Sequence, residues 1–378
     1  MKVLKWLKKE PMLTLSVLAA IVGMIITPPG AELPGQIDWR TLGTLLMMLC
    51  VLEGFKQENV LAPVVNLASR LRTMRSLTLF LVFGVFFTSM FVTNDVSLLI
   101  FVPLTILLFR SAGQERFILP VITMENIAAI RGSLLMPFGS PQNLFLYGQA
   151  QVSFGHFLLH MLPLCGMSAV LLIIFIFILY RKEPRLEALP KKQDAPPAPF
   201  GFRRGMYLAL FALILLVIVT RTEWWYIALA VVLVTIAAAD HRLFLKVDYV
   251  LLVTFLCFFV FSSSIAGNPT IASFLERNVA HHEYWWSIGL SQIISNVPAS
   301  IVLYPFSKNF AGLIYGADTA GLCSLIGSLA SVINYRIYIR EYPQNGKKFV
   351  KTFTLISWAF FLIVVIPGFL LSQWDFFS

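Results

Sequence analysis

Three consecutive polar residues, Thr93, Asn94 and Asp95, interrupt a long apolar segment that runs from Ser76 to Phe109. Polar groups at the middle of such a segment are costly in a lipid bilayer, and they usually face a cavity or a transport pathway. The other half of the chain has a similar break, Ser295-Asn296-Val297-Pro298. Interrupted apolar segments at corresponding places in two halves are typical of a secondary transporter's binding site.

The composition indicates a membrane protein. Of the 378 residues, 58% are hydrophobic and 13% are charged, whereas soluble domains have about 25% charged residues. The length allows about nine to ten spans of roughly 20 residues each. The net charge of +10 comes from short basic clusters between apolar runs. Because cytoplasmic loops have this pattern, we expect a cytoplasmic N-terminus, a lipid bilayer as partner and no nucleic acid.

A proline-rich basic segment, residues 181–204, is predicted to be a cytoplasmic linker that divides the chain into two similar halves. Each half has a polar-tipped hairpin followed by a broken helix that contains a Gly-Ser pair. The extra span between the halves would reverse the orientation of the second, so we expect two inverted-topology repeats in an all-α polytopic fold. The predicted boundaries are 11–180 for the first repeat (hairpin 76–109, broken helix 117–147), 205–222 for the connecting span, and 223–372 for the second repeat (hairpin 284–307, broken helix 312–338).

Both hairpins are predicted to be re-entrant. The first is flanked by arginines, Arg70, Arg72 and Arg75 before it and Arg110 and Arg116 after it. If cationic loops stay in the cytoplasm, both of its ends are cytoplasmic and its polar tip lies at mid-membrane. Each limb of the second hairpin has about a dozen residues, or roughly 18 Å of helix, which reaches mid-membrane without crossing.

Four motifs carry a family resemblance that covers nearly the whole chain. They are Thr93-Asn94-Asp95 with the following Val-Ser-Leu-Leu-Ile-Phe-Val-Pro103, Gly139-Ser140-Pro141-Gln142-Asn143, Ser295-Asn296-Val297-Pro298, and Gly327-Ser328. With these motifs the chain resembles the ion transporter superfamily of anion permeases, which holds citrate and dicarboxylate symporters, arsenite permeases and sodium/proton antiporters. The resemblance implies a prokaryotic plasma membrane (cell inner membrane) location, a homodimer, and binding of substrate and ion at the hairpin tips and broken-helix loops. Asp95 beside the tip asparagine looks more like the arsenite-permease branch, because the dicarboxylate branch has Ser-Asn-Thr at each tip.

The candidate substrate site consists of polar groups at the tips and in the first broken helix. Helix N-termini and side-chain donors at the tips favour anions, although the same residues could act only as helix caps. Arg131 could balance an anionic substrate, since a guanidinium fits carboxylates and oxyanions, or it could form a buried structural ion pair. The expected substrate-binding residues are Thr93, Asn94, Ser295, Asn296, Asn143 and Arg131.

Asp95 is the leading candidate for ion coupling. A carboxylic acid in a low-dielectric medium favours its neutral form, so Asp95 could exchange a proton. It could also bind a cation, pair with Arg131 or cap a helix. Backbone carbonyls in the broken-helix loops suit a hard cation such as Na⁺, or the loops could be plain helix breaks. The expected coupling-ion residues are Asp95, Gly139, Ser140, Gly327, Ser328 and Asn334.

The sequence has no Ser-His-Asp set, phosphate-binding loop or metal cluster, so we expect neither an enzyme nor a cofactor beyond H⁺ or Na⁺. We predict a secondary active transporter of a small anion, a carboxylate or an inorganic oxyanion, that is coupled to H⁺ or Na⁺ and works by elevator-like alternating access. The alternatives are a cation/proton antiporter of the same fold that uses Asp95, a passive channel, and a membrane-embedded enzyme with Asp95, Glu125 and Arg131. The histidines lie near span ends or in loops, where an interfacial position is expected: His156, His160, His241, His281 and His282.

Overall fold

The computed structural model of the protein is helical, and it has no β-strand in the residues it describes. These are residues 11–58 except 29 and 31, residues 60 and 71, residues 73–183 except 151, residue 186, and residues 201–374 except 221. Arg70, Arg72 and most of the predicted linker lie outside them. Within the described part, seven helices are long and apolar enough to cross a membrane, and α2 is a shorter apolar helix. The predicted class, an all-α integral membrane protein, is confirmed.

The helices follow one another in the order expected for two halves. Short 3₁₀ turns join several of them. The helices are α2 (Pro11–Ile26), α3 (Leu33–Gln36), α4 (Trp39–Gln57), α6 (Met74–Val92), α7 (Asn94–Ser111), α8 (Ile118–Ser133), α9 (Pro141–Gln149), α10 (Phe154–Leu179), α11 (Phe202–Thr220), α12 (Trp225–Asp240), α13 (Tyr249–Ala266), α14 (Pro269–Val279), α15 (Glu283–Ile294), α16 (Asn296–Leu303), α17 (Phe310–Ala320), α18 (Leu329–Glu341) and α19 (Gly346–Ser372).

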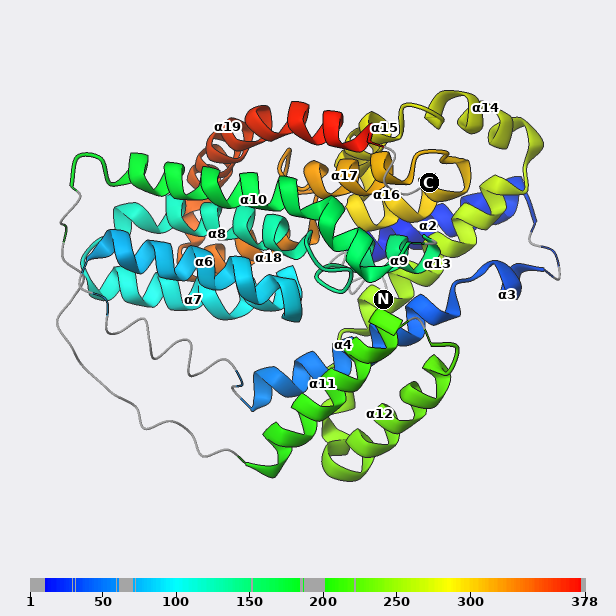
Figure 1. The fold of residues 1–378 in the computed structure, drawn as a ribbon, viewed down its shortest axis with the longest axis horizontal. Helices are drawn as coiled ribbons and strands as arrows, with labels where there is room; N and C mark the ends of the chain where they lie inside the picture. The colour runs from blue at the N-terminus through cyan, green and yellow to red at the C-terminus, as the bar shows by residue number, and fades with distance from the viewer. Residues whose placement is uncertain are drawn as a thin grey trace.

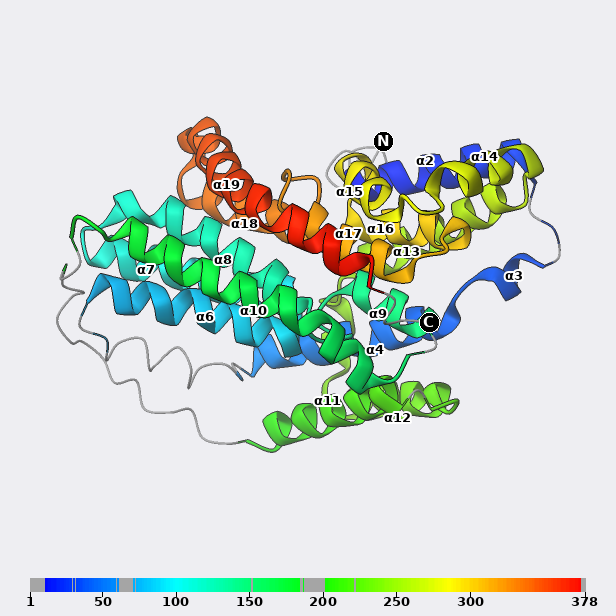
Figure 2. The same ribbon diagram turned by 45° about the horizontal axis from the view of Figure 1, so that its top comes forward.

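Three groups of helices are visible in Figures 1 and 2. The first group, α6, α7, α8 and α10, lies at one end of the molecule, and the second group, α2 and α13 to α17, lies at the other. Helices α4, α11 and α12 pack on one another and form a third group to one side. Helix α19 packs on both α8 and α17, and so joins the first two groups.

Both predicted hairpins are present, and each turns at a single residue. Thr93 separates α6 from α7 with φ 71° and ψ 155°, and Ser295 separates α15 from α16 with φ 70° and ψ 159°. The first hairpin has limbs of 19 and 18 residues, about 28 and about 27 Å of helix, so either limb could cross a bilayer by its length. The second has shorter limbs of 12 and 8 residues. Re-entry to mid-membrane and the inverted orientation of the halves stay predictions.

Both predicted broken helices are also present. Residues 134–140 separate α8 from α9, and residues 321–328 separate α17 from α18. A Cβ on Gly139 would clash with the Ser133 carbonyl, and a Cβ on Gly327 would clash with the Ala320 carbonyl. Glycine at these positions therefore lets each loop fold back against the end of the preceding helix.

The arginines that flank the first hairpin gather at one end of the first group. The end of α10 joins them, because the Thr78 hydroxyl lies 2.8 Å from the Tyr180 hydroxyl and Arg116 forms an ion pair with Glu183. That this end faces the cytoplasm, as the positive-inside rule predicts, stays a prediction. The described arginines of the hairpin are Arg75, Arg110 and Arg116, and Arg181 follows α10.

The expectation for one histidine is wrong. His160 on α10 is buried, and its Nδ1 lies 2.9 Å from the Tyr315 hydroxyl on α17. The Tyr315 hydroxyl also donates a hydrogen bond to the His160 carbonyl. A partner from the other half of the chain makes burial of this side chain acceptable, and nothing in the local sequence indicates that partner.

Glycines allow each hairpin to pack closely on its broken helix. Gly132 of α8 lies against the Phe86 carbonyl of α6, and Gly316 of α17 lies against the Tyr284 carbonyl of α15. Small residues let helix backbones approach within membranes, where packing rather than the hydrophobic effect drives association. The two hairpin and broken-helix units therefore use the same packing device.

Gly132→Ala should lower the thermal stability of the detergent-solubilised protein. The added Cβ would clash with the Phe86 carbonyl, and overpacking costs about 1–3 kcal/mol of unfolding free energy. Gly166→Ala is a matched control, because Gly166 lies in α10 with nothing within 4 Å of its Cβ position. Melting can be followed by tryptophan fluorescence, and equal melting temperatures for the two variants would contradict the close packing of α6 on α8.

Candidate functional site at the crossing of the broken helices

The two broken helices contact each other in the protein interior. Asn126 Nδ2 of α8 donates to Ser331 Oγ of α18 at 3.0 Å, and Asn334 Nδ2 of α18 donates to the Ile122 carbonyl of α8 at 2.6 Å. Helix α9 packs against α16 and α17. We call the region where α8, α9 and α17 meet the two unwound loops the crossing.

The crossing contains one arginine and one acidic residue, both without exposed surface. These are Arg131 of α8 and Asp318 of α17. Arg131 Nη2 lies 3.5 Å from Thr319 Oγ1. Its Nε and Nη1 have no hydrogen-bond partner among the described residues. Two nitrogens of a buried guanidinium therefore have N–H donors left for a ligand.

Asp318 is the carboxylate whose charge acts on Arg131. The two side chains do not form an ion pair within 4.0 Å. Instead, Gln142 Nε2 donates to Asp318 Oδ1 at 3.1 Å. The Asn143 side-chain nitrogen, in the amide orientation that satisfies its neighbours, donates to Asp318 at 3.3 Å. The carboxylate is thus held by the first turn of α9, where the helix dipole favours negative charge.

Both hairpin tips contact the crossing. The Asn94 backbone N–H donates to the Gly139 carbonyl at 3.3 Å, and Asn296 Nδ2 donates to the Ala317 carbonyl at 3.4 Å, next to Asp318. The structure therefore brings together Asn94, Asn143, Arg131 and Asn296 of the predicted substrate residues, with Thr93 and Ser295 at the turns beside them.

The predicted coupling-ion residues of the two loops have structural contacts. Ser140 Oγ accepts from the Asn143 backbone N–H at 3.4 Å and so caps α9. Ser328 begins α18 without a side-chain cap bond, and Asn334 lies in the contact between α18 and α8. These contacts are those expected of helix breaks and packing groups. An ion-binding role for these residues stays a prediction.

Asp95 is separate from the Arg131 cluster. It lies in the first turn of α7, where its Oδ1 is buried without a partner among the described residues. The charges that act on it are those of Asp248 and Lys56. Neither Asp95 nor Glu125 pairs with Arg131 within 4.0 Å, and Glu125 Oε1 instead accepts from Thr105 Oγ1 at 2.5 Å.

Asp318 and Gln142 are site residues that sequence reasoning missed. Asp318 is the one charged residue between Phe310 and Cys323. An ionisable residue inside an apolar segment is a functional candidate by itself, so that signal was available. Gln142 was recognised as part of a motif, but its partner lies in the other half of the chain, and no local pattern indicates it.

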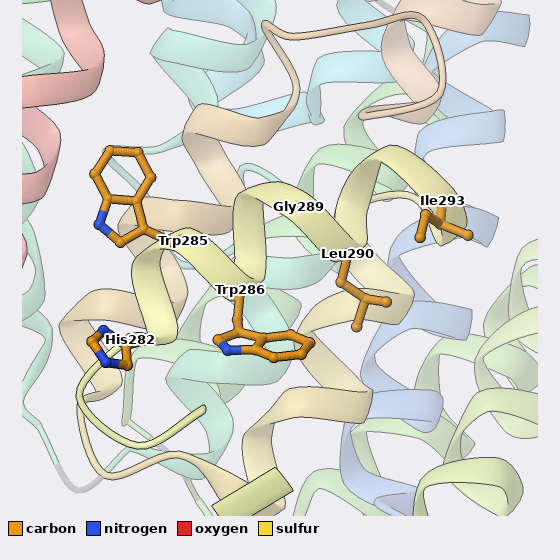
Figure 3. A pocket seen from close by; sticks show the side chains of 6 residues that line it. All are labelled: His282, Trp285, Trp286, Gly289, Leu290 and Ile293. Atoms are coloured by element: carbon orange, nitrogen blue, oxygen red, sulfur yellow. The ribbon is translucent and has the colours of Figure 1, made fainter. Parts of the chain in front are cut away.

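A separate groove lies on the outer face of the second hairpin, as Figure 3 shows. It contains no residue of the crossing, and its lining is mostly apolar. An open, indole-lined groove on the surface of a membrane protein suits lipid better than a polar substrate. Its lining residues are His282, Trp285, Trp286, Gly289, Leu290 and Ile293.

The backbone of both tips is strained. Thr93 and Ser295 occupy a φ and ψ region that is essentially reserved for glycine, which costs about 1–3 kcal/mol per residue and is typical of functional sites. We expect Thr93→Gly and Ser295→Gly to raise the melting temperature of the purified protein and to reduce its transport activity, because each removes a hydroxyl from the site. A fall in melting temperature for both variants would contradict the conclusion that the backbone of the tips is strained.

His281→Gly is the matched control for that experiment. His281 also has a positive φ, 69°, but it lies before α15 and away from the tip. His281→Gly should leave transport activity unchanged. Like Thr93→Gly and Ser295→Gly, it should relieve the strain of a residue with a positive φ.

Comparison with known proteins identifies the family. The citrate transporter family (CitMHS) matches residues 3–327. Inner membrane protein YbiR of Escherichia coli (strain K12) is 30% identical over 352 residues, which cover 89% of this chain and 90% of that protein. A protein of Methanocaldococcus jannaschii named as an uncharacterized transporter is 29% identical over 334 residues, which cover 87% of this chain and 88% of that protein.

A solved structure has a similar fold. The Alcanivorax borkumensis YdaH transporter, whose crystal structure is described as having an unusual topology, aligns with a TM-score of 0.52 and 15% identity. The alignment covers 92% of this chain and 89% of that one. With the family match, it confirms the resemblance drawn from the sequence motifs. The chain belongs to the citrate transporter family, and it is a membrane transporter rather than an enzyme.

Proposed function

We propose that the protein is a secondary active transporter of a small anion, a carboxylate or an inorganic oxyanion, coupled to H⁺ or Na⁺. The observation that carries this proposal is the fully buried guanidinium of Arg131, whose Nε and Nη1 have no partner among the described residues. A guanidinium offers planar N–H donors along two edges, Nε with Nη2 and Nη1 with Nη2, and either edge matches the oxygens of carboxylates and oxyanions. The family description, citrate transporter, agrees with a carboxylate substrate.

Helix N-termini add to the attraction for an anion. Helices α7 and α16 begin at the tip asparagines Asn94 and Asn296, and α9 begins in the loop that Asn94 contacts. The positive end of the helix dipole stabilises negative charge at such places. Half-helices that point their N-termini at an anionic group are a common device in secondary transporters.

The grouping of helices supports alternating access by movement of one unit against another. Helices α4, α11 and α12 form a group of their own, set to one side of both hairpins (Figure 2). We assign this group to a scaffold and the hairpin-bearing helices to a transport unit. A homodimer and a location in the cell inner membrane, as the name of the Escherichia coli relative suggests, complete the proposal.

Uptake into proteoliposomes tests the function. Citrate, succinate, phosphate and arsenate are offered in turn under an inward proton or sodium gradient, and at least one should accumulate. Arg131→Gln should reduce uptake of that anion by roughly 10- to 100-fold, because a hydrogen bond to a charged group contributes about 1.5–3 kcal/mol. Arg277→Gln, on the exposed face of α14, is the control and should keep full uptake.

Two other outcomes of the uptake experiment would indicate a different function. Uptake that does not depend on any ion gradient would indicate a channel. Proton or sodium exchange without anion movement, abolished by Asp95→Asn but not by Arg131→Gln, would favour the cation/proton antiporter.

A further inference from the structure

The crossing has balanced charge when Arg131 and Asp318 are both in their ordinary charge states. Arg131 then contributes one positive charge and Asp318 one negative charge. The other titratable groups that act on them come from α15, α17, α10 and the second loop, and they are tyrosines and cysteines. Both residue types are neutral near pH 7 at their ordinary pKa values. These groups are Tyr284, Tyr315, Cys165 and Cys323.

Anion binding would disturb that balance. An anion on the free donors of Arg131 neutralises the guanidinium and leaves Asp318 as an uncompensated carboxylate. An unpaired charge in a low-dielectric interior is strongly unfavourable. The anion would also lie close to Asp318, and two like charges repel. The site can therefore accept an anion only if the charge on Asp318 is removed at the same time.

We propose that Asp318 is the cation-binding group that couples transport, and that one monovalent cation neutralises its carboxylate whenever an anion occupies Arg131. This inference rests on the proposed function and adds the coupling residue to it. The cation is H⁺ or Na⁺, and either one would neutralise the buried carboxylate. Asp318 then explains coupling by charge balance at a single place in the protein.

The contacts of Asp318 suit this role. Its carboxylate is held by the amides of Gln142 and Asn143 rather than by Arg131. The guanidinium can thus bind an anion without pulling Asp318 from its place. Asp95, the other acidic residue near a tip, does not act on Arg131, because the charges around it are those of Lys56 and Asp248. A cation bound at Asp95 would leave the crossing unbalanced.

The test compares anion affinity in the wild type and in Asp318→Asn. Binding of citrate, succinate, phosphate and arsenate to the purified full-length protein is measured between pH 5.5 and 8 at fixed Na⁺, and between low and high Na⁺ at fixed pH. If one cation is bound with each anion, linkage requires the dissociation constant to change up to about tenfold per pH unit, or per tenfold change in Na⁺. Asp318→Asn should lose that dependence. Any titration of the anion itself is common to both proteins and cancels in the comparison.

The two arms identify the cation. A difference in slope on the pH axis indicates a proton, and a difference on the sodium axis indicates Na⁺. Glu276→Gln, an equivalent replacement on the exposed face of α14, should keep the wild-type slopes. Equal slopes for the wild type and Asp318→Asn on both axes would overturn the inference, even if Arg131→Gln abolishes binding and so supports the proposed function.

A second measurement does not depend on the variant folding. Calorimetry of anion binding to the wild type in two buffers of different ionisation enthalpy counts the protons taken up, and a sodium titration counts the sodium ions. One cation per anion, beyond those that the anion itself exchanges, is expected. A count of zero for both cations overturns the inference, and failure of every anion to bind the wild type overturns both the inference and the proposed function.

Discussion

A charged guanidinium inside a membrane protein needs a counter-charge, and the arrangement of this molecule follows from that need. Arg131 is fully buried in the first half of the chain, and the carboxylate that acts on it, Asp318, belongs to the second half. Removing one member of a buried charge pair typically costs about 3–5 kcal/mol. The pair therefore favours a fold in which the two broken helices meet. The contacts of Asn126 with Ser331 and of Asn334 with Ile122 extend that meeting along α8 and α18.

The unwound segments are possible because glycine and serine stand where the helices stop. Each loop turns back against the helix that precedes it, and each hairpin packs on its broken helix through another glycine. Irregular backbone at membrane depth is tolerated where it is buried in protein or lines a cavity. The first loop is mostly buried here, whereas Ile326 of the second loop is half exposed. The tip asparagines contact backbone carbonyls of Gly139 and Ala317, and the first turn of α9 contacts Asp318. The elements that weaken the helices are thus the ones that build a polar site.

Much of this fold could be predicted from sequence because the bilayer makes polar residues conspicuous. The tips at Thr93 and Ser295 and the two Gly-Ser breaks stand out against apolar neighbours, and each marks an interruption that the structure contains. Asp318 was missed because it stands alone in its apolar run and belongs to no cluster of polar residues.

Pairings between the halves were the least predictable part. Asp95 received the main coupling role in the sequence interpretation because it lies at a tip, but the charges that act on it come from Lys56 and Asp248. Which acidic residue reaches Arg131 depends on how α8 and α17 cross, and a single sequence contains no local signal for that. The same holds for His160, whose partner Tyr315 is in the other half.

The position of the bound anion is the most direct test of this account. A cryo-electron microscopy or crystallographic map of the purified protein with a transported anion should show density within hydrogen-bond distance of Arg131 Nε or Nη1, between the tips at Asn94 and Asn296. Anion density elsewhere, for example beside Asp95 with the Arg131 donors still free, would contradict it.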